Sequence, residues 1–153
     1  MVNEGVAQPD FLPALRFRFD DIQVLEAGAI PFGPNNIVTA PNPFTIRMDV
    51  GFDGPLTLLL FGLTLTAEHH VQQIETGAVF VLPGGSVTIP AALLAASHLT
   101  ITSGPFTTVA APAAPGQPLG TGTYRITTHI HPPAPIAGIV AAFQDGLIVQ
   151  IVS

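Results

Sequence analysis

Two short motifs hold the residues with the clearest capacity for chemistry, Glu-His-His at residues 68–70 and His-Ile-His at residues 129–131. Side chains alternate along a β-strand, so the first and third residues of each motif share one face of their strand. Residues two apart on a strand are separated by about 6 to 7 Å, which allows two imidazoles to bind one metal ion. If the two strands are neighbours, the motifs predict a single site for a divalent transition metal such as zinc. Its predicted ligands are Glu68, His70, His129 and His131.

This hypothesis has a geometric criterion. Because metal–nitrogen bonds are close to 2 Å long, ligand atoms from three of His69, His70, His129 and His131 must lie within about 4 to 5 Å of one point. The alternative is that these histidines are ordinary polar residues on a solvated strand face, since a single sequence does not show that the two motifs are adjacent. The fifth histidine, His98, is expected at the end of a turn.

The sequence lacks the residue patterns of the common catalytic sites. No serine lies in a Gly-x-Ser-x-Gly motif, and the absence of cysteine excludes a thiolate nucleophile or a thiolate zinc site. Gly84-Gly85 has neither the lysine nor the helix of a phosphate-binding loop. Asp20 and Asp21 are adjacent, and adjacent strand residues point to opposite faces. We therefore expect a non-enzymatic protein with no catalytic residue and no cofactor, a bound divalent metal being the alternative.

The amino-acid composition restricts which classes of molecule we expect the protein to bind. The 153 residues include four arginines, no lysine and ten acidic residues, which gives a formal charge of -6. Nucleic acids and anionic membrane surfaces require clusters of Lys and Arg, so neither is an expected partner. Hydrophobic residues make up 48% of the chain and charged residues only 9%. Because so little charge is available for the surface, we expect a self-associating subunit of a homo-oligomer, filament or shell, or a module that binds another protein.

Alternating apolar and polar residues predict an all-β fold. The clearest strand covers residues 44–52, and Asp53-Gly54 is expected to turn it into a hairpin with residues 56–66. Pro83-Gly84-Gly85 is interpreted as a second hairpin turn. About eight to ten short strands, without alternating helices, indicate one antiparallel β-sandwich over residues 14–153. A short helix is expected only near residues 91–96, and residues 1–13 are interpreted as an N-terminal arm.

A local pattern around Tyr124 resembles the tyrosine corner of immunoglobulin-like and fibronectin-like sandwiches. Gly122 precedes the tyrosine by two residues, and alternation places Tyr124, Ile126, Thr128 and Ile130 on the inner face. The resemblance covers about eight residues and implies that the tyrosine hydroxyl bonds to backbone upstream. It implies an immunoglobulin-like fold without a particular function, and antibody-type domains are excluded because the disulfide cysteine and the tryptophan are missing.

A second pattern resembles the first motif of cupins, which bind metal inside a β-barrel. It consists of His70, Glu75 and Gly77, followed by a Val-Thr-Ile-Pro run that ends at Pro90. The first ligand histidine of the cupin motif corresponds to Glu68 here, and the expected Pro-x-Gly is missing after Pro90. The resemblance implies a cupin-like metal site as a further alternative.

The N-terminal residues and the apolar runs of the sequence bear on where the protein is located in the cell. Residues 1–6 lack the basic segment and apolar stretch of a Sec signal peptide. The most apolar run, residues 56–67, spans about 12 residues, whereas a membrane-spanning helix needs about 20. We expect no membrane insertion and either a cytoplasmic protein or one exported by another route.

Overall fold

The structure is a computed structural model that describes residues 16–27, 36–53, 62, 64–90, 98–112, 119–131 and 142–153. These residues form β-strands, turns and irregular segments and contain no helix, so the all-β prediction is confirmed for them. The predicted arm at 1–13 and the predicted helix at 91–96 lie outside the described residues. The described residues form nine strands, which are β1 (Arg16–Glu26), β2 (Ile37–Thr39), β3 (Phe44–Asp53), β4 (Thr64–Gln73), β5 (Val79–Thr88), β6 (His98–Phe106), β7 (Thr108–Pro112), β8 (Leu119–His131) and β9 (Ala142–Val152).

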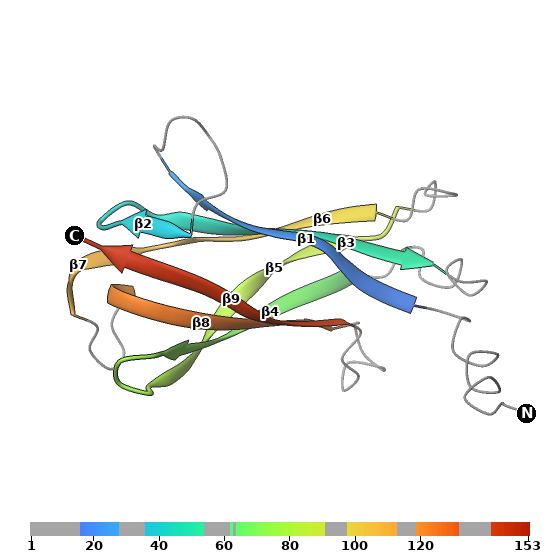
Figure 1. Cartoon of the computed structure of the whole chain (residues 1–153). Helices are drawn as coiled ribbons and strands as arrows, with labels where there is room; N and C mark the ends of the chain where they lie inside the picture. The colour runs from blue at the N-terminus through green and yellow to red at the C-terminus, as the bar shows by residue number, and fades with distance from the viewer. Residues whose placement is uncertain are drawn as a thin grey trace, which may run out of the picture.

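The strands form two facing sheets (Figure 1). The smaller sheet has the order β1-β3-β6, and the larger has the order β2-β9-β8-β4-β5, with β7 beside β8. Apolar side chains of both sheets form one buried cluster, with Met48 and Ile101 from the smaller sheet and Ile126 and Val149 from the larger. The two layers around one core are those of a β-sandwich. No helix in the described part of the chain has the length and apolar character needed to cross a membrane.

Two short strands depart from the antiparallel arrangement. β2 pairs with β9 in parallel, and β7 pairs with β8 in parallel, whereas the other pairings among the described strands are antiparallel. The prediction of a purely antiparallel sandwich is therefore wrong at these two positions. Both β8 and β9 keep their antiparallel pairing with each other, so a short parallel strand can be added without loss of that ladder.

The hairpin predicted between residues 44–52 and 56–66 is not formed by the described strands. β3 pairs with β1 on one side and with β6 on the other, and both belong to the smaller sheet. β4 lies in the larger sheet between β5 and β8. The chain therefore changes sheets between β3 and β4, and this change allows the second histidine motif to lie beside the first.

The predicted turn at Pro83-Gly84-Gly85 is also wrong, because these residues lie inside β5. β5 pairs with β4 on both sides of this point, and its register shifts there. The amide of Gly85 donates to the hydroxyl of Ser103 on β6 at 2.8 Å, and a Cβ on Gly85 would lie 2.0 Å from the backbone oxygen of Thr102. Glycine is needed here because two backbones approach closely, as at a bulge within a strand.

Tyr124 makes the bond that the tyrosine-corner pattern predicts. Its hydroxyl donates to the backbone oxygen of Gly120 at 2.8 Å, and the side chain is fully buried. The ring also meets the ring of Phe80 edge to face. The bond holds the start of β8 against the core, and β8 carries the second histidine motif.

Candidate metal site

The outward-facing residues of the two histidine motifs lie side by side on the outer face of the larger sheet. β4 and β8 are antiparallel neighbours, and their register places Glu68 opposite His129. Thr66 is opposite His131 and His70 is opposite Thr127, so all of these side chains share one face. The alternation of buried and exposed residues along both strands fixes this orientation. The condition of the sequence hypothesis, that the two strands are neighbours, is therefore met.

Three of the four predicted ligands form a tight group. One donor atom from each of Glu68, His70 and His129 lies within 4.8 Å of the others. The Nε2 atom of His70 and the Oε1 atom of Glu68 are hydrogen-bonded at 2.6 Å, and the His70 and His129 ring centroids are 4.7 Å apart. Donor atoms around a tetrahedral zinc ion lie roughly 3.4 Å apart, given bonds of about 2.0 to 2.1 Å. Modest rotations of these half-buried side chains would therefore surround an ion.

His131 and His69 are placed differently. The Nε2 atom of His131 lies 4.0 Å from Glu68, and its ring is 6.0 Å from that of His129, outside the tight group. His69 is fully buried on the inner face, where its Nδ1 atom hydrogen-bonds the hydroxyl of Thr128 at 2.8 Å. The group thus contains two histidines and one carboxylate, whereas the sequence criterion required three histidines.

Electrostatics favour a neutral His129. Partial burial, and then the neighbouring His70 and His131, lower the pKa of His129 below its ordinary value, although Glu68 acts in the opposite direction. Imidazole binds a metal ion only in its neutral form, so a lowered pKa reduces the competition from protons. Imidazole and carboxylate ligands suit zinc and other borderline divalent metals.

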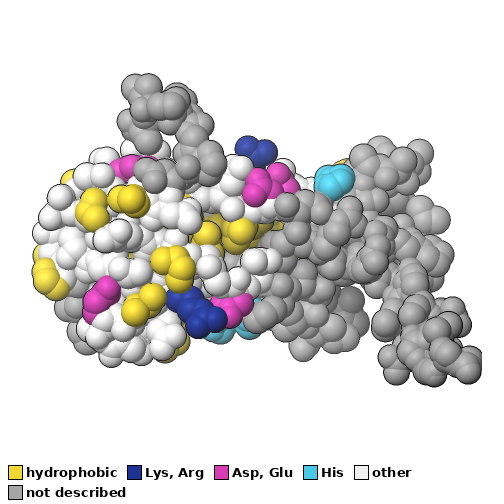
Figure 2. All heavy atoms as spheres, viewed as in Figure 1, with side chains coloured by type: hydrophobic (Ala, Val, Ile, Leu, Met, Phe, Trp, Pro, Cys, Tyr) yellow, Lys and Arg dark blue, Asp and Glu magenta, His cyan; other side chains and the backbone are white. Residues whose placement is uncertain are grey.

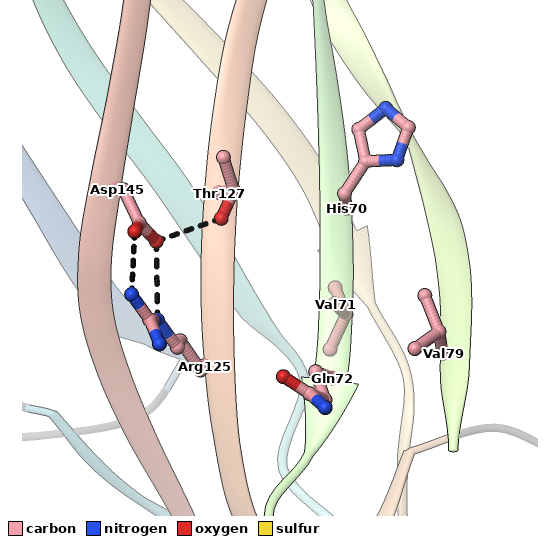
Figure 3. A pocket seen from close by; sticks show the side chains of 7 residues that line it. All are labelled: His70, Val71, Gln72, Val79, Arg125, Thr127 and Asp145. Atoms are coloured by element: carbon pink, nitrogen blue, oxygen red, sulfur yellow. Dashed lines mark hydrogen bonds and ion pairs between the residues drawn. The ribbon is translucent and has the colours of Figure 1, made fainter. Parts of the chain in front are cut away.

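A shallow depression of about 250 Å³ adjoins the group and shares His70 with it (Figure 3). Val79 and His70 lie on one side, and Arg125, Thr127 and Asp145 lie on the other. Asp145 accepts hydrogen bonds from the Arg125 guanidinium and the Thr127 hydroxyl, and these bonds lower the pKa of its carboxyl group. The ion pair of Arg125 and Asp145 carries no net charge. Glu68 therefore supplies the remaining formal charge next to the histidines.

The cupin-like pattern does not apply to this site. The carboxylate of Glu75 accepts the backbone N–H of Thr123, and this bond is the main cause of the lowered pKa of Glu75. The histidine group lies on the outer face of its sheet, whereas cupin ligands lie inside a barrel. The chain matches no known protein-family model, and no curated protein is significantly similar to it in sequence.

Proposed function

We propose that this protein binds a divalent transition metal, such as zinc, on the outer face of β4 and β8. The observation that carries the proposal is the pairing of Glu68 with His129, which brings donor atoms of Glu68, His70 and His129 within 4.8 Å of one another. Three donors on one face provide a coordination site with one position open, as zinc has in sites with three protein ligands. His131 lies near enough to Glu68 to orient it through a hydrogen bond after a small movement.

The proposed role is binding rather than catalysis. The ligands are half-buried on an open sheet face, and the neighbouring depression is shallow. Catalytic sites gain much of their effect by excluding water and fixing dipoles around the reacting atoms. A flat, solvated surface provides neither, so we infer that the metal acts as a structural or connecting element.

Elemental analysis and a zinc titration against a coloured chelator test the proposal on tag-free protein. We expect one zinc per chain for the wild type and at least a tenfold loss of affinity for His70→Gln/His129→Gln. The control is His98→Gln, which exchanges the same residue type at the start of β6 in the other sheet. Binding of the wild type no tighter than that of the double variant would rule out the site.

The pH dependence provides a second readout. Imidazole binds a metal ion only in its neutral form, so the affinity should decrease as the solution is acidified, and binding should release protons. The lowered pKa of His129 makes its own contribution persist to a lower pH than an unperturbed histidine would allow. Affinity that is constant between pH 7.5 and 5.5 would exclude imidazole ligands.

We also propose that the fold is immunoglobulin-like in the broad sense. The hydrogen bond from Tyr124 to Gly120, four residues upstream, supports this assignment, together with the two facing sheets. Tyr124→Phe tests this assignment, since it should destabilise the fold if the hydrogen bond to Gly120 is the corner bond of such sandwiches.

A further inference from the structure

Asp145 and Gly146 form a β-bulge in β9. The register of β9 against β8 shifts at this point, where both residues lie opposite Thr127. Gly146 has a φ angle of +91°, in the left-handed region that residues with a Cβ atom rarely adopt. An extra residue together with a glycine in this conformation is typical of a bulge in an antiparallel pair. The bulge therefore requires glycine at position 146.

The carboxylate of Asp145 is fixed by bonds to β8 and to its own strand. Its two oxygens accept hydrogen bonds from the guanidinium of Arg125, the hydroxyl of Thr127 and the backbone N–H of Gly146. The pair with Arg125 is bidentate, a geometry that lysine does not reproduce. Aspartate and glycine are thus required next to each other for separate structural reasons.

An Asp-Gly sequence is chemically labile. The backbone nitrogen of the glycine can attack the side-chain carbon of the protonated aspartic acid. A C–N bond then forms, the C–OH bond breaks, and the hydroxyl leaves with the amide hydrogen as water. A second water opens the resulting cyclic imide. Opening at the side-chain carbonyl restores aspartate, whereas opening at the backbone carbonyl gives isoaspartate, in which the main chain runs through the side-chain carbon.

The reacting groups of Asp145 and Gly146 lie close together at the protein surface. The nitrogen of Gly146 is 2.7 Å from the Oδ1 atom of Asp145. The side chains of Arg125 and Asp145 are 50% and 36% exposed, so water reaches the pair. Figure 2 shows arginine and acidic side chains next to each other on the visible surface, and Figure 3 shows how Asp145 lies between its partners. Proximity of the reacting groups favours ring closure.

The hydrogen bonds of Asp145 oppose this reaction. The bonds from Arg125 and then Thr127 lower the pKa of Asp145 and keep it ionised, whereas the departing oxygen must carry a proton. Both carboxylate oxygens are bonded to β8, so the group cannot turn toward the nitrogen of Gly146 unless these bonds break. The folded state therefore combines a labile sequence with contacts that protect it.

We propose that Asp145-Gly146 is a site of spontaneous isoaspartate formation, and that the bonds from Arg125 and Thr127 to Asp145 slow this reaction in the folded protein. The inference does not depend on the metal site. Isoaspartate adds a carbon atom to the main chain of β9 and moves the carboxylate away from the Arg125 guanidinium. The modified protein loses the ion pair that borders the depression beside His70.

Arg125→Lys tests the proposal, because it keeps the charge and removes the bidentate pair. After incubation at neutral pH, trypsin releases residues 126–153 from both proteins, since it cleaves after arginine and lysine. Chromatography and enzymatic methylation of isoaspartate quantify the product in this peptide. We expect the variant to form isoaspartate at position 145 roughly threefold or more faster than the wild type. Thr127→Val, which removes one bond to Asp145, should increase the rate by a smaller factor.

The matched control is Arg47→Lys, which makes the same exchange beside Asp49 in the smaller sheet and should leave the rate at position 145 unchanged. The second Asp-Gly pair of the sequence, Asp53-Gly54, is measured in the same digest and should react equally in wild type and Arg125→Lys. Wild-type protein unfolded in urea should react faster at position 145 than folded protein. Equal rates at position 145 in wild type and Arg125→Lys would overturn the inference. An increase of the same size in the control or at Asp53, or an unfolded chain that reacts no faster than the folded one, would overturn it as well.

Discussion

The two faces of the β4–β8 pair use histidine in opposite ways. On the outer face, His70 is hydrogen-bonded to Glu68 and lies beside His129. On the inner face, one residue earlier, His69 is fully buried, with its Nδ1 atom bonded to Thr128 and its Nε2 atom without a hydrogen-bond partner. A step of one residue along a strand therefore separates a candidate metal ligand from a core residue.

The difference shows how the surroundings decide what an imidazole can do. On the outer face, the His70 ring is partly exposed to water and hydrogen-bonded to Glu68. Burial, assisted by the neighbouring His70, lowers the pKa of His69 from 6.5 to about 4, so His69 is neutral at physiological pH. Its ring meets the ring of Phe106 edge to face, in a place where a charge would have no solvation.

Among the tests of this difference between the two faces, we expect acidification to have the largest effect on stability. The unfolded chain protonates His69 near pH 6.5 and the folded chain only near pH 4, so the unfolded state binds more protons between these values. The contribution of His69 to stability is complete above pH 6.5 and is lost as the pH falls toward 4. The two pKa values differ by an amount that corresponds to about 3 kcal/mol in the free energy of unfolding. Urea unfolding at several pH values measures this loss.

The double variant His69→Leu/Thr128→Val isolates this contribution. It removes the buried imidazole together with its hydroxyl partner, so the acid-dependent loss should decrease by about 3 kcal/mol relative to the wild type. His98→Gln, which changes an exposed histidine on the other sheet, should retain the full pH dependence. If the double variant and the wild type lose stability in parallel between pH 6.5 and 4, His69 is not the responsible group.

A smaller effect is expected when only one member of the inner pair is removed. Thr128→Val leaves both ring nitrogens of buried His69 without a partner, which should cost about 1 to 3 kcal/mol at pH 7. Adding His69→Leu should recover most of this cost, because two apolar groups then replace the pair. Denaturant midpoints of the single and double variants measure this coupling, and additive effects would show that the pair does not act as a unit.

The inner face also contains Tyr124, for which we expect a loss of about 1 kcal/mol in Tyr124→Phe. The hydroxyl donates to the Gly120 oxygen, and its removal leaves that buried acceptor unpaired. Zinc affinity should remain unchanged, since Tyr124 lies on the opposite face from His129. Thermal unfolding and the zinc titration check both parts, and a variant that melts with the wild type would mean that the corner bond does not stabilise β8.

Alternation along the chain predicted which side chains face the core. Tyr124, Ile126, Thr128 and Ile130 are buried as expected, and the outward direction of Glu68 and His129 follows from the same rule. The pairing of β4 with β8 joins residues about 60 positions apart, and alternation within one strand carries no information about its neighbour. The adjacency of the two motifs therefore had to come from the structure.

Glycine and proline caused the main errors in the predicted fold. Pro83-Gly84-Gly85 has the composition of a turn, but the same residues also permit a bulge where β5 approaches β6. The two uses differ in what surrounds the backbone, and the sequence does not specify those surroundings. β8 likewise continues for 13 residues through Gly120 and Gly122.

The smallest effect is expected on the outer face, where His70→Thr/His129→Thr should change the stability of metal-free protein by no more than about 0.5 kcal/mol. Both side chains are partly exposed, and threonine suits a solvated strand face.

With zinc present the result should differ, since an ion at 100 times its dissociation constant stabilises a folded protein by about 2.7 kcal/mol, and the variant should lose this gain. Thermal melts of both proteins with chelator and with zinc measure the four stabilities. Equal melting temperatures with chelator but not with zinc would support an outer face that serves binding while the inner face maintains the fold. A large loss of stability in the metal-free variant would instead give the outer histidines the same structural role as His69.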